Sequence, residues 1–173
     1  FFDPDLTTGP VPIGLAAAAI AVFGNQYTLP LYVAGVLHLC LALAVICGVS
    51  RAAGRASAIA FAISLALLLS YFEPLWWQLL TGDTSSLFWG ILGLQLTVRG
   101  MESGRVGVLL GAGVLLGLSL LSKSVGGMFL AATVAYVVLV GFWNRPIVAK
   151  ASLTLVAGLL LCLLPWQLYK LTT

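Results

Sequence analysis

The chain has 173 residues, of which 61% are hydrophobic and 8% charged, whereas a soluble domain is about 45–50% apolar and about 25% charged. Eight Lys and Arg against five Asp and Glu give a net charge of +3, and the basic residues form no stripe. This composition excludes a soluble enzyme, a disordered chain, a disulfide-stapled secreted module and nucleic-acid binding as a main role. It indicates an all-α, polytopic helical membrane protein.

Apolar runs separated by polar or charged residues predict the helices in chain order. The runs cover residues 11–23, 29–49, 56–72, 85–98, 106–121, 125–143 and 151–168. The second run has 21 residues and reaches about 31 Å, enough to cross a hydrocarbon core of about 30 Å. The sixth and seventh runs also span, and the third to fifth do so with their flanks. The first run, with 13 residues, reaches only about 20 Å and is too short.

Charge gives the orientation of the spans. Six of the eight basic residues lie in three alternate loops: Arg51, Arg55, Arg99, Arg105, Arg145 and Lys150. The positive-inside rule makes these loops cytoplasmic in a multi-pass protein of the inner (plasma) membrane. The loops on the opposite side hold Glu73 and Asp83, and then Lys123.

The first run is therefore expected to form a short interfacial or re-entrant helix, with Thr7 or Thr8 as its cap. If it crossed the membrane, Asp3 and Asp5 would join the arginine loops; if it does not, they join the other acids outside. We expect a single transmembrane domain over residues 1–173. Residues 1–28 form the outer-face segment, and residues 29–173 form a bundle of about six transmembrane helices.

Small residues and cysteines are assigned to packing. Glycines at Gly107-x-x-x-Gly111 and Gly113-x-x-x-Gly117 predict close approach of neighbouring helices. Cys40, Cys47 and Cys162 all lie inside apolar runs. Two thiols seven residues apart on one helix lie about 10 Å apart along its axis and cannot bridge, so no disulfide or metal site is implied.

Polar residues near the membrane are the candidates for chemistry, because charge there is costly. Lys123, in the turn LLSKSVGG, could bind the phosphate of a lipid, or it could be a lysine that snorkels at a helix end. Asp83 could contact a metal ion or line an outward-facing cavity, but Asp83 or Thr84 could also simply cap the next helix. Asp3 and Asp5 could bind a metal ion or an acceptor hydroxyl, or they could form a solvated turn around Pro4.

Together these segments resemble the GT-C-type, polyprenyl-phosphate-dependent glycosyltransferases, the relatives of the protein mannosyltransferases and the aminoarabinose lipid A transferases. TTGPVPIGLAAAAIAVFG is similar to the family's Pro-containing turn and interfacial helix, and VSRAAGR to its arginine-bearing cytoplasmic turn. LLTGDTSSLFWGILGL resembles the segment with an acidic residue before a span, and GVLLGLSLLSKSVGGMFL the family's Thr-Lys signature, with Ser122 and Lys123 at those two positions. LLPWQLYKL is similar to a downstream Pro-Trp turn, and the order of the elements agrees across nearly the whole chain.

The resemblance implies an inverting transfer of a sugar from a polyprenyl-phosphate donor to an acceptor at the non-cytoplasmic face. It assigns the lipid phosphate to Lys123. The catalytic base of the family is an acid in an earlier outer loop, which is expected upstream of Phe1; Asp3 and Asp5 are the candidates within this chain. We therefore expect an internal piece of a larger enzyme, whose partners are a polyprenyl-phosphate-linked sugar and membrane lipid. No cofactor is assigned, and a divalent metal ion stays open.

Two other classes also fit the composition. A non-catalytic scaffold or assembly subunit of a larger membrane complex would lack the upstream acidic pair and would copurify with its partners in fixed stoichiometry. A transporter segment would show a second, related half and broken helices near the midplane, and no such half is visible in this sequence.

Overall fold

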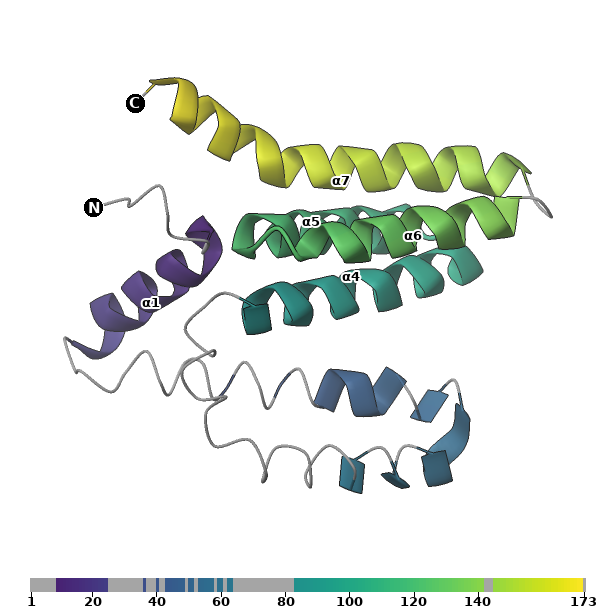
Figure 1. Cartoon of the computed structure of the whole chain (residues 1–173). Coiled ribbons are helices and arrows are strands. Elements are labelled where there is room, and N and C mark those ends of the chain that lie inside the picture. Colours follow the sequence, from purple (N-terminus) through teal and green to yellow (C-terminus); the bar gives the residue numbers. More distant parts are fainter. Residues whose placement is uncertain are drawn as a thin grey trace.

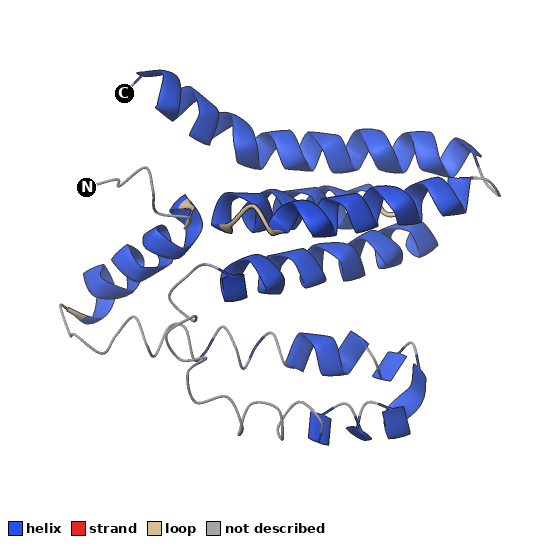
Figure 2. Cartoon of the chain, viewed as in Figure 1, coloured by secondary structure: helices blue, strands red, loops and turns tan. Residues whose placement is uncertain are grey.

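The computed structural model describes residues 9–24, 36, 40, 43–48, 50–51, 53–57, 59–60, 62–63, 83–141 and 145–172. Every regular element within these ranges is a helix (Figure 2). The helices with defined bounds are α1 (Pro10–Phe23), α4 (Asp83–Ser103), α5 (Val106–Ser122), α6 (Gly126–Gly141) and α7 (Arg145–Thr172). Further helical residues lie between positions 36 and 63. The predicted all-α class is confirmed.

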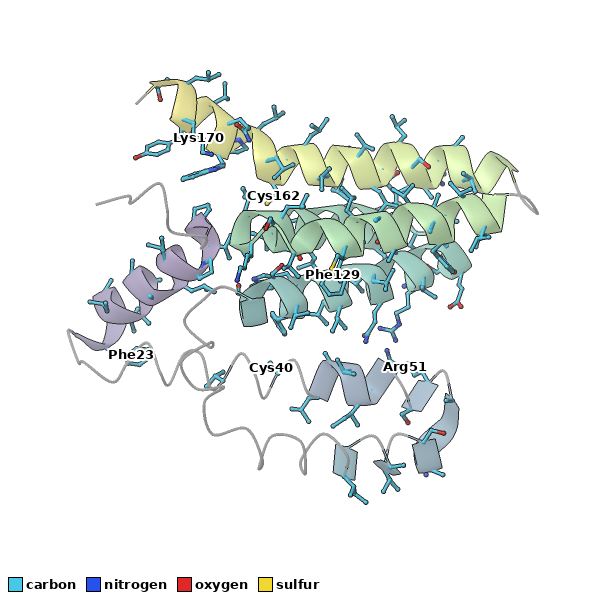
Figure 3. The ribbon with its side chains drawn as sticks, viewed as in Figure 1. Phe23, Cys40, Arg51, Phe129, Cys162 and Lys170 are labelled. Atoms are coloured by element: carbon cyan, nitrogen blue, oxygen red, sulfur yellow. The ribbon has the colours of Figure 1, made fainter. Side chains whose placement is uncertain are left out.

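Helices α4 to α7 form an antiparallel bundle, in which α5 lies between α4 and α7 while α6 packs against all three (Figure 1). The start of α4, the end of α5 and the start of α6 meet at one end, which we call the Lys123 end; the end of α7 lies on the same side, where its last turns bend away from the other helices (Figure 1). The other end, which we call the arginine end, holds the α4–α5 loop with Arg105 and the start of α7. Arg51 lies at this arginine end in Figure 3. Basic residues from separate loops thus gather at one end of the bundle, as their alternation predicts.

Glycine ends two of the helices. Gly104 follows α4 with a φ of +64°, and Gly24 follows α1 with a φ of +82° while its N–H donates to the Ile20 carbonyl at 2.9 Å. Glycine adopts this left-handed region without the steric cost of a Cβ. The start of α1 differs from the prediction: its N-cap is Gly9, without a side-chain cap, rather than Thr7 or Thr8. Pro10 is the first residue of the helix. Proline is favoured there because the N–H that it lacks would have no partner within the helix.

Helix α1 lies beyond the Lys123 end of the bundle and is inclined to the axes of α4–α7 (Figure 1). It has 14 residues, none of them buried, and within the described residues it packs against α5. At 1.5 Å per residue it is about 21 Å long, shorter than a hydrocarbon core of about 30 Å. A helix of the predicted short length is therefore confirmed, and it does not run alongside the bundle.

The surface of the bundle is apolar enough for a bilayer. In α7, the segment Val148–Thr172 has 25 residues and a mean hydropathy of 2.0, and it is the one described helix long and apolar enough to cross a membrane. Leu153 is 74% exposed and Leu161 62% exposed, an orientation that is costly in water and favourable in lipid. Helices α1, α5 and α6 are shorter apolar helices. Since the runs 29–49 and 56–72 lie largely outside the described residues, six spans stay a prediction.

Glycines set the crossing of α5 and α7. A Cβ at Gly113 would strike the Leu155 carbonyl of α7, and one at Gly117 would lie 2.7 Å from Cys162 Cβ. From the other side, Gly158 lies against the backbone of α5. The predicted role of Gly113-x-x-x-Gly117 in close packing is confirmed. By contrast, a Cβ at Gly107 or Gly111 would meet no atom of the described chain within 4 Å, so this second pair mediates no described contact.

Candidate functional site

Buried serines join α4 to α5 at the Lys123 end. The Trp89 indole N–H donates to Ser85 Oγ at 3.1 Å, and Ser85 Oγ lies 3.0 Å from Ser122 Oγ. Ser122 Oγ donates to the Leu118 carbonyl at 2.8 Å. Because a hydroxyl has a single proton, Ser122 must accept from Ser85. The hydrogen bonds therefore run in one direction, from Trp89 through both serines to the backbone of α5.

A second pair of serines lies beside the first, one residue later in α4 and three residues earlier in α5. Ser86 Oγ donates to the Ser119 carbonyl at 3.0 Å, and Ser119 Oγ donates to the Ser86 carbonyl at 2.7 Å. Both side chains are fully buried, at 0% exposure. No buried side-chain nitrogen or oxygen in the described chain lacks a hydrogen-bond partner. This reciprocal pair fixes the position of α4 along the axis of α5, and with it the position of the residues that follow Ser122.

Lys123 ends α5 and begins the turn into α6. Its N–H donates to the Ser119 carbonyl at 3.2 Å, and its own carbonyl accepts from the Gly126 N–H at 2.9 Å. A Cβ at Gly126 would lie only 2.5 Å from the Ser119 carbonyl carbon, so the start of α6 is pressed against the end of α5. The Lys123 side chain is half-buried. Hydrogen bonds thus hold both the N–H and the carbonyl of Lys123, while its side chain stays partly exposed at the surface of the bundle.

The beginning of α1 docks onto the same turn. The Gly9 N–H donates to the Ser122 carbonyl at 2.8 Å, and a Cβ at Gly9 would coincide with the Leu121 carbonyl. Only glycine allows this approach of the two backbones. Gly9, the residue directly before α1, is therefore anchored beside Lys123.

The structure brings some of the predicted residues together at this end. Asp83 is the first residue of α4, two positions before Ser85, so its backbone lies at the Lys123 end; its side chain lies outside the described part, as do Asp3 and Asp5. Thr84 falls within the first turn of α4 rather than before it. The residues that the structure describes contain no group of three or more His, Cys, Asp or Glu that could hold a metal ion.

The end of α7 adds aromatic residues and a second lysine. The rings of Trp166 and Tyr169 stack with centroids 5.6 Å apart, and Lys170 Nζ lies 5.4 Å from the centroid of the Trp166 ring. Such a cation–π contact stabilises an ammonium over an indole face. Lys170 lies at the end of the bundle where α5 ends and α1 begins (Figure 3). Within the described chain, this end therefore holds two lysines, Lys123 in the turn and Lys170 on the outer helix.

An apolar hollow of about 160 Å³ lies between α5, α6 and α7. Valine and leucine side chains line most of it, and its polar members are Thr133 and Ser152. The Thr133 hydroxyl already donates to the Phe129 carbonyl at 2.8 Å. A charged phosphate or a sugar would find no ionic partner in this hollow, so polar chemistry belongs to the Lys123 end.

Sequence reasoning missed the serine network. Ser119 and Ser122 are three residues apart in an otherwise apolar segment, and Ser85 and Ser86 begin the preceding one. Polar residues at helical spacing in apolar helices commonly face another helix, since lipid cannot accept their hydrogen bonds. That pattern is the signal that could have identified the pairing of α4 with α5.

Comparison with known proteins identifies the family. The family profile of the dolichyl-phosphate-mannose-protein mannosyltransferases matches residues 7–169, which is nearly the whole chain and includes α1, the serine network and Lys123. No curated protein and no solved structure gives a significant match. The helical architecture, the apolar surface and the order of the elements all agree with a membrane protein. The chain therefore belongs to the dolichyl-phosphate-mannose-protein mannosyltransferase family of membrane glycosyltransferases.

Proposed function

We propose that this chain is part of a membrane glycosyltransferase that moves a sugar from a polyprenyl-phosphate donor to an acceptor at the non-cytoplasmic face, and that Lys123 binds the donor phosphate. The family match supports glycosyl transfer in a membrane. The observation that carries the assignment of Lys123 is the way its turn is built, between the serine network of α4 and α5 and the docked start of α1.

The phosphate needs a positive partner that the backbone of this turn does not supply. The N–H groups at the start of α6 would ordinarily be available to an anion. Here the Gly126, Gly127 and Met128 N–H groups donate to the carbonyls of Lys123, Ser124 and Val125. Their capacity is used within the turn, so the lysine ammonium is the group suited to the phosphate. As a compact point charge it binds a phosphate and stabilises it as it leaves.

The catalytic base must be a carboxylate that can reach the Lys123 turn. Asp5 precedes Gly9 by four positions in the sequence, and four residues span at most about 14 Å. The hydrogen bond from Gly9 to Ser122 places Gly9 beside the Lys123 turn, so a carboxylate a few residues before Gly9 can reach the donor phosphate. The candidates for the catalytic base are therefore Asp3, Asp5 and the acids expected upstream. In the proposed step, the acceptor oxygen attacks the anomeric carbon with inversion, and the bond from that carbon to the phosphate oxygen breaks. The acceptor proton passes to the carboxylate, and polyprenyl phosphate leaves beside Lys123.

Charge supports the assignment of the face. Arg51 and the α4–α5 loop with Arg105 lie at the opposite end of the bundle (Figure 3), which the positive-inside rule makes cytoplasmic. The Lys123 end is then non-cytoplasmic. Donor and acceptor meet there at the membrane surface, where the polyprenyl chain stays in lipid.

The test compares two lysines at the same end. Binding of dolichyl phosphate to the intact protein in detergent is measured for wild type, Lys123→Ala and Lys170→Ala. Loss of a hydrogen bond to a charged group weakens binding about 10- to 100-fold, so we expect that loss for Lys123→Ala and wild-type affinity for Lys170→Ala. Equal affinities for wild type and Lys123→Ala would remove Lys123 from the site. A wild-type protein that binds no dolichyl phosphate and copurifies with partners in fixed stoichiometry would instead be a scaffold.

A further inference from the structure

A groove of about 660 Å³ lies between α4 and the helical residues 43–48, 50 and 51, away from the Lys123 end. Gln95 fixes its width, because the Gln95 amide donates to the Ala44 carbonyl at 2.9 Å. Gly48 reinforces this spacing, since a Cβ there would lie 2.5 Å from the same amide nitrogen. The groove is therefore a defined feature of the packing between these two segments.

The two ends of the groove differ in chemistry. Its wall toward the middle of the bundle is apolar and includes Val45, Ile91 and Leu94. Toward the arginine end, the lining changes to Arg51, Arg99 and Glu102, all of them exposed. An adjoining hollow of about 550 Å³ shares Arg99 and Glu102 and adds Arg105. Three guanidinium groups and one carboxylate thus give the mouth a net charge of +2 (three positive, one negative).

The guanidinium groups at the mouth are available to an anion. Among the described residues, Glu102 forms no ion pair within 4.0 Å with Arg51, Arg99 or Arg105. Guanidinium groups bind phosphate oxygens in a bidentate geometry. Basic pockets between transmembrane helices on the cytoplasmic side recognise anionic lipid headgroups in this way.

The geometry points to a structural binding site for an anionic phospholipid at the arginine end, separate from the donor site. Its phosphodiester contacts Arg51 and Arg99, and one acyl chain lies along Val45, Ile91 and Leu94. The apolar wall decides between a lipid and a free anion, because inorganic phosphate would make no use of it. Such a lipid would tie Val45, Gly48 and Arg51 to α4 across the groove.

The experiment measures lipid preference in the intact protein. Wild type and variants are exchanged into mixed micelles of phosphatidylglycerol and phosphatidylcholine, and the lipids that remain bound are quantified. We expect Arg51→Gln and Arg99→Gln each to lower the preference for phosphatidylglycerol about fivefold. Arg55→Gln is the matched control, since Arg55 is exposed near the same end but does not line the groove. Glu102→Gln should raise the preference, because it removes the negative charge at the mouth.

Several results would overturn the proposal. One is an Arg55→Gln effect as large as that of Arg51→Gln, which would mean a diffuse surface charge. Another is the absence of any preference for phosphatidylglycerol in wild type. A third is displacement of the lipid by millimolar inorganic phosphate or glycerol 3-phosphate, which would indicate a site for a free anion. Thermal unfolding in phosphatidylcholine alone should be the same for all four variants, which checks their folding.

Discussion

The packing of Gly126 against α5 gives the sharpest test of how the Lys123 turn is held. The change is Gly126→Ala, with Gly127→Ala as its matched control in the next position. A Cβ at Gly126 would lie 2.5 Å from the Ser119 carbonyl carbon and 2.6 Å from the Leu120 nitrogen. A Cβ at Gly127 would meet no described atom within 4 Å. Neither glycine has a positive φ, so both alanines are compatible with the local backbone.

The magnitude follows from these distances. Carbon atoms in contact normally lie about 3.5–4.0 Å apart, so α5 and α6 must separate by about 1 Å around the new methyl group of Gly126→Ala. The atoms in the way belong to backbone and cannot rotate aside, and overpacking of this kind costs about 1–3 kcal/mol. An alanine without a clash stabilises by about 0.4–1 kcal/mol, through the unfolded state. We therefore expect Gly126→Ala to destabilise by about 1–2 kcal/mol and Gly127→Ala to be slightly stabilising.

The assay is thermal unfolding of the purified intact protein in detergent. For a chain of this size, 1 kcal/mol corresponds to about 2–4 °C in Tm. A difference of about 2 kcal/mol between the two variants would therefore separate their Tm values by about 4–8 °C. Gly126→Ala should also weaken binding of dolichyl phosphate, because the same displacement moves Lys123. Equal Tm values for the two variants would refute the close packing of α5 against α6.

The remaining predictions concern orientation and helix packing. In a cysteine-free background, Ser124→Cys should react with a membrane-impermeant maleimide from the non-cytoplasmic side and Ser103→Cys only after permeabilisation; the opposite result would reverse the topology. Gly113→Ala should destabilise by about 1–3 kcal/mol because its methyl group would strike the backbone of α7. Gly107→Ala, in the same helix but in open space, should leave the Tm unchanged or raise it; equal losses would contradict the observed crossing. Ser86→Ala should cost about 0.5–1.5 kcal/mol in thermal unfolding, since it removes one of the two hydrogen bonds that the Ser119 carbonyl accepts, and unchanged stability would mean that the serine pair does not hold the two helices.

Much of the architecture follows from composition along the chain. The apolar runs at 11–23, 106–121 and 125–143 correspond to α1, α5 and α6 with small differences at the ends. Helix α7 begins six residues earlier than the run at 151–168 predicts, because it includes Arg145 and Lys150 (151 − 145 = 6). Hydropathy underestimates the length of a helix whose first turns carry charged residues, since such turns can extend past the hydrocarbon core.

The candidate site was predictable only in outline. Lys123 in a turn between two apolar runs could be seen in the sequence, and the structure confirms that placement. The docking of Gly9 onto Ser122 could not, because it joins positions more than a hundred residues apart in the sequence (122 − 9 = 113). The roles of Asp3, Asp5 and Asp83 stay predictions that depend on the experiments above.

The sequence by itself determined the class of the protein, the approximate lengths of its helices and the gathering of arginines at one end. These properties are sums over neighbouring residues, because hydropathy and charge act in proportion to how many such residues a segment contains. Only the tertiary structure decided that Ser86 pairs with Ser119, that Gly113 rather than Gly107 touches α7, and that α1 begins against the Lys123 turn. Those contacts depend on how far each helix is rotated about its axis, which is set jointly by the side chains of both partners and is not written in either segment alone.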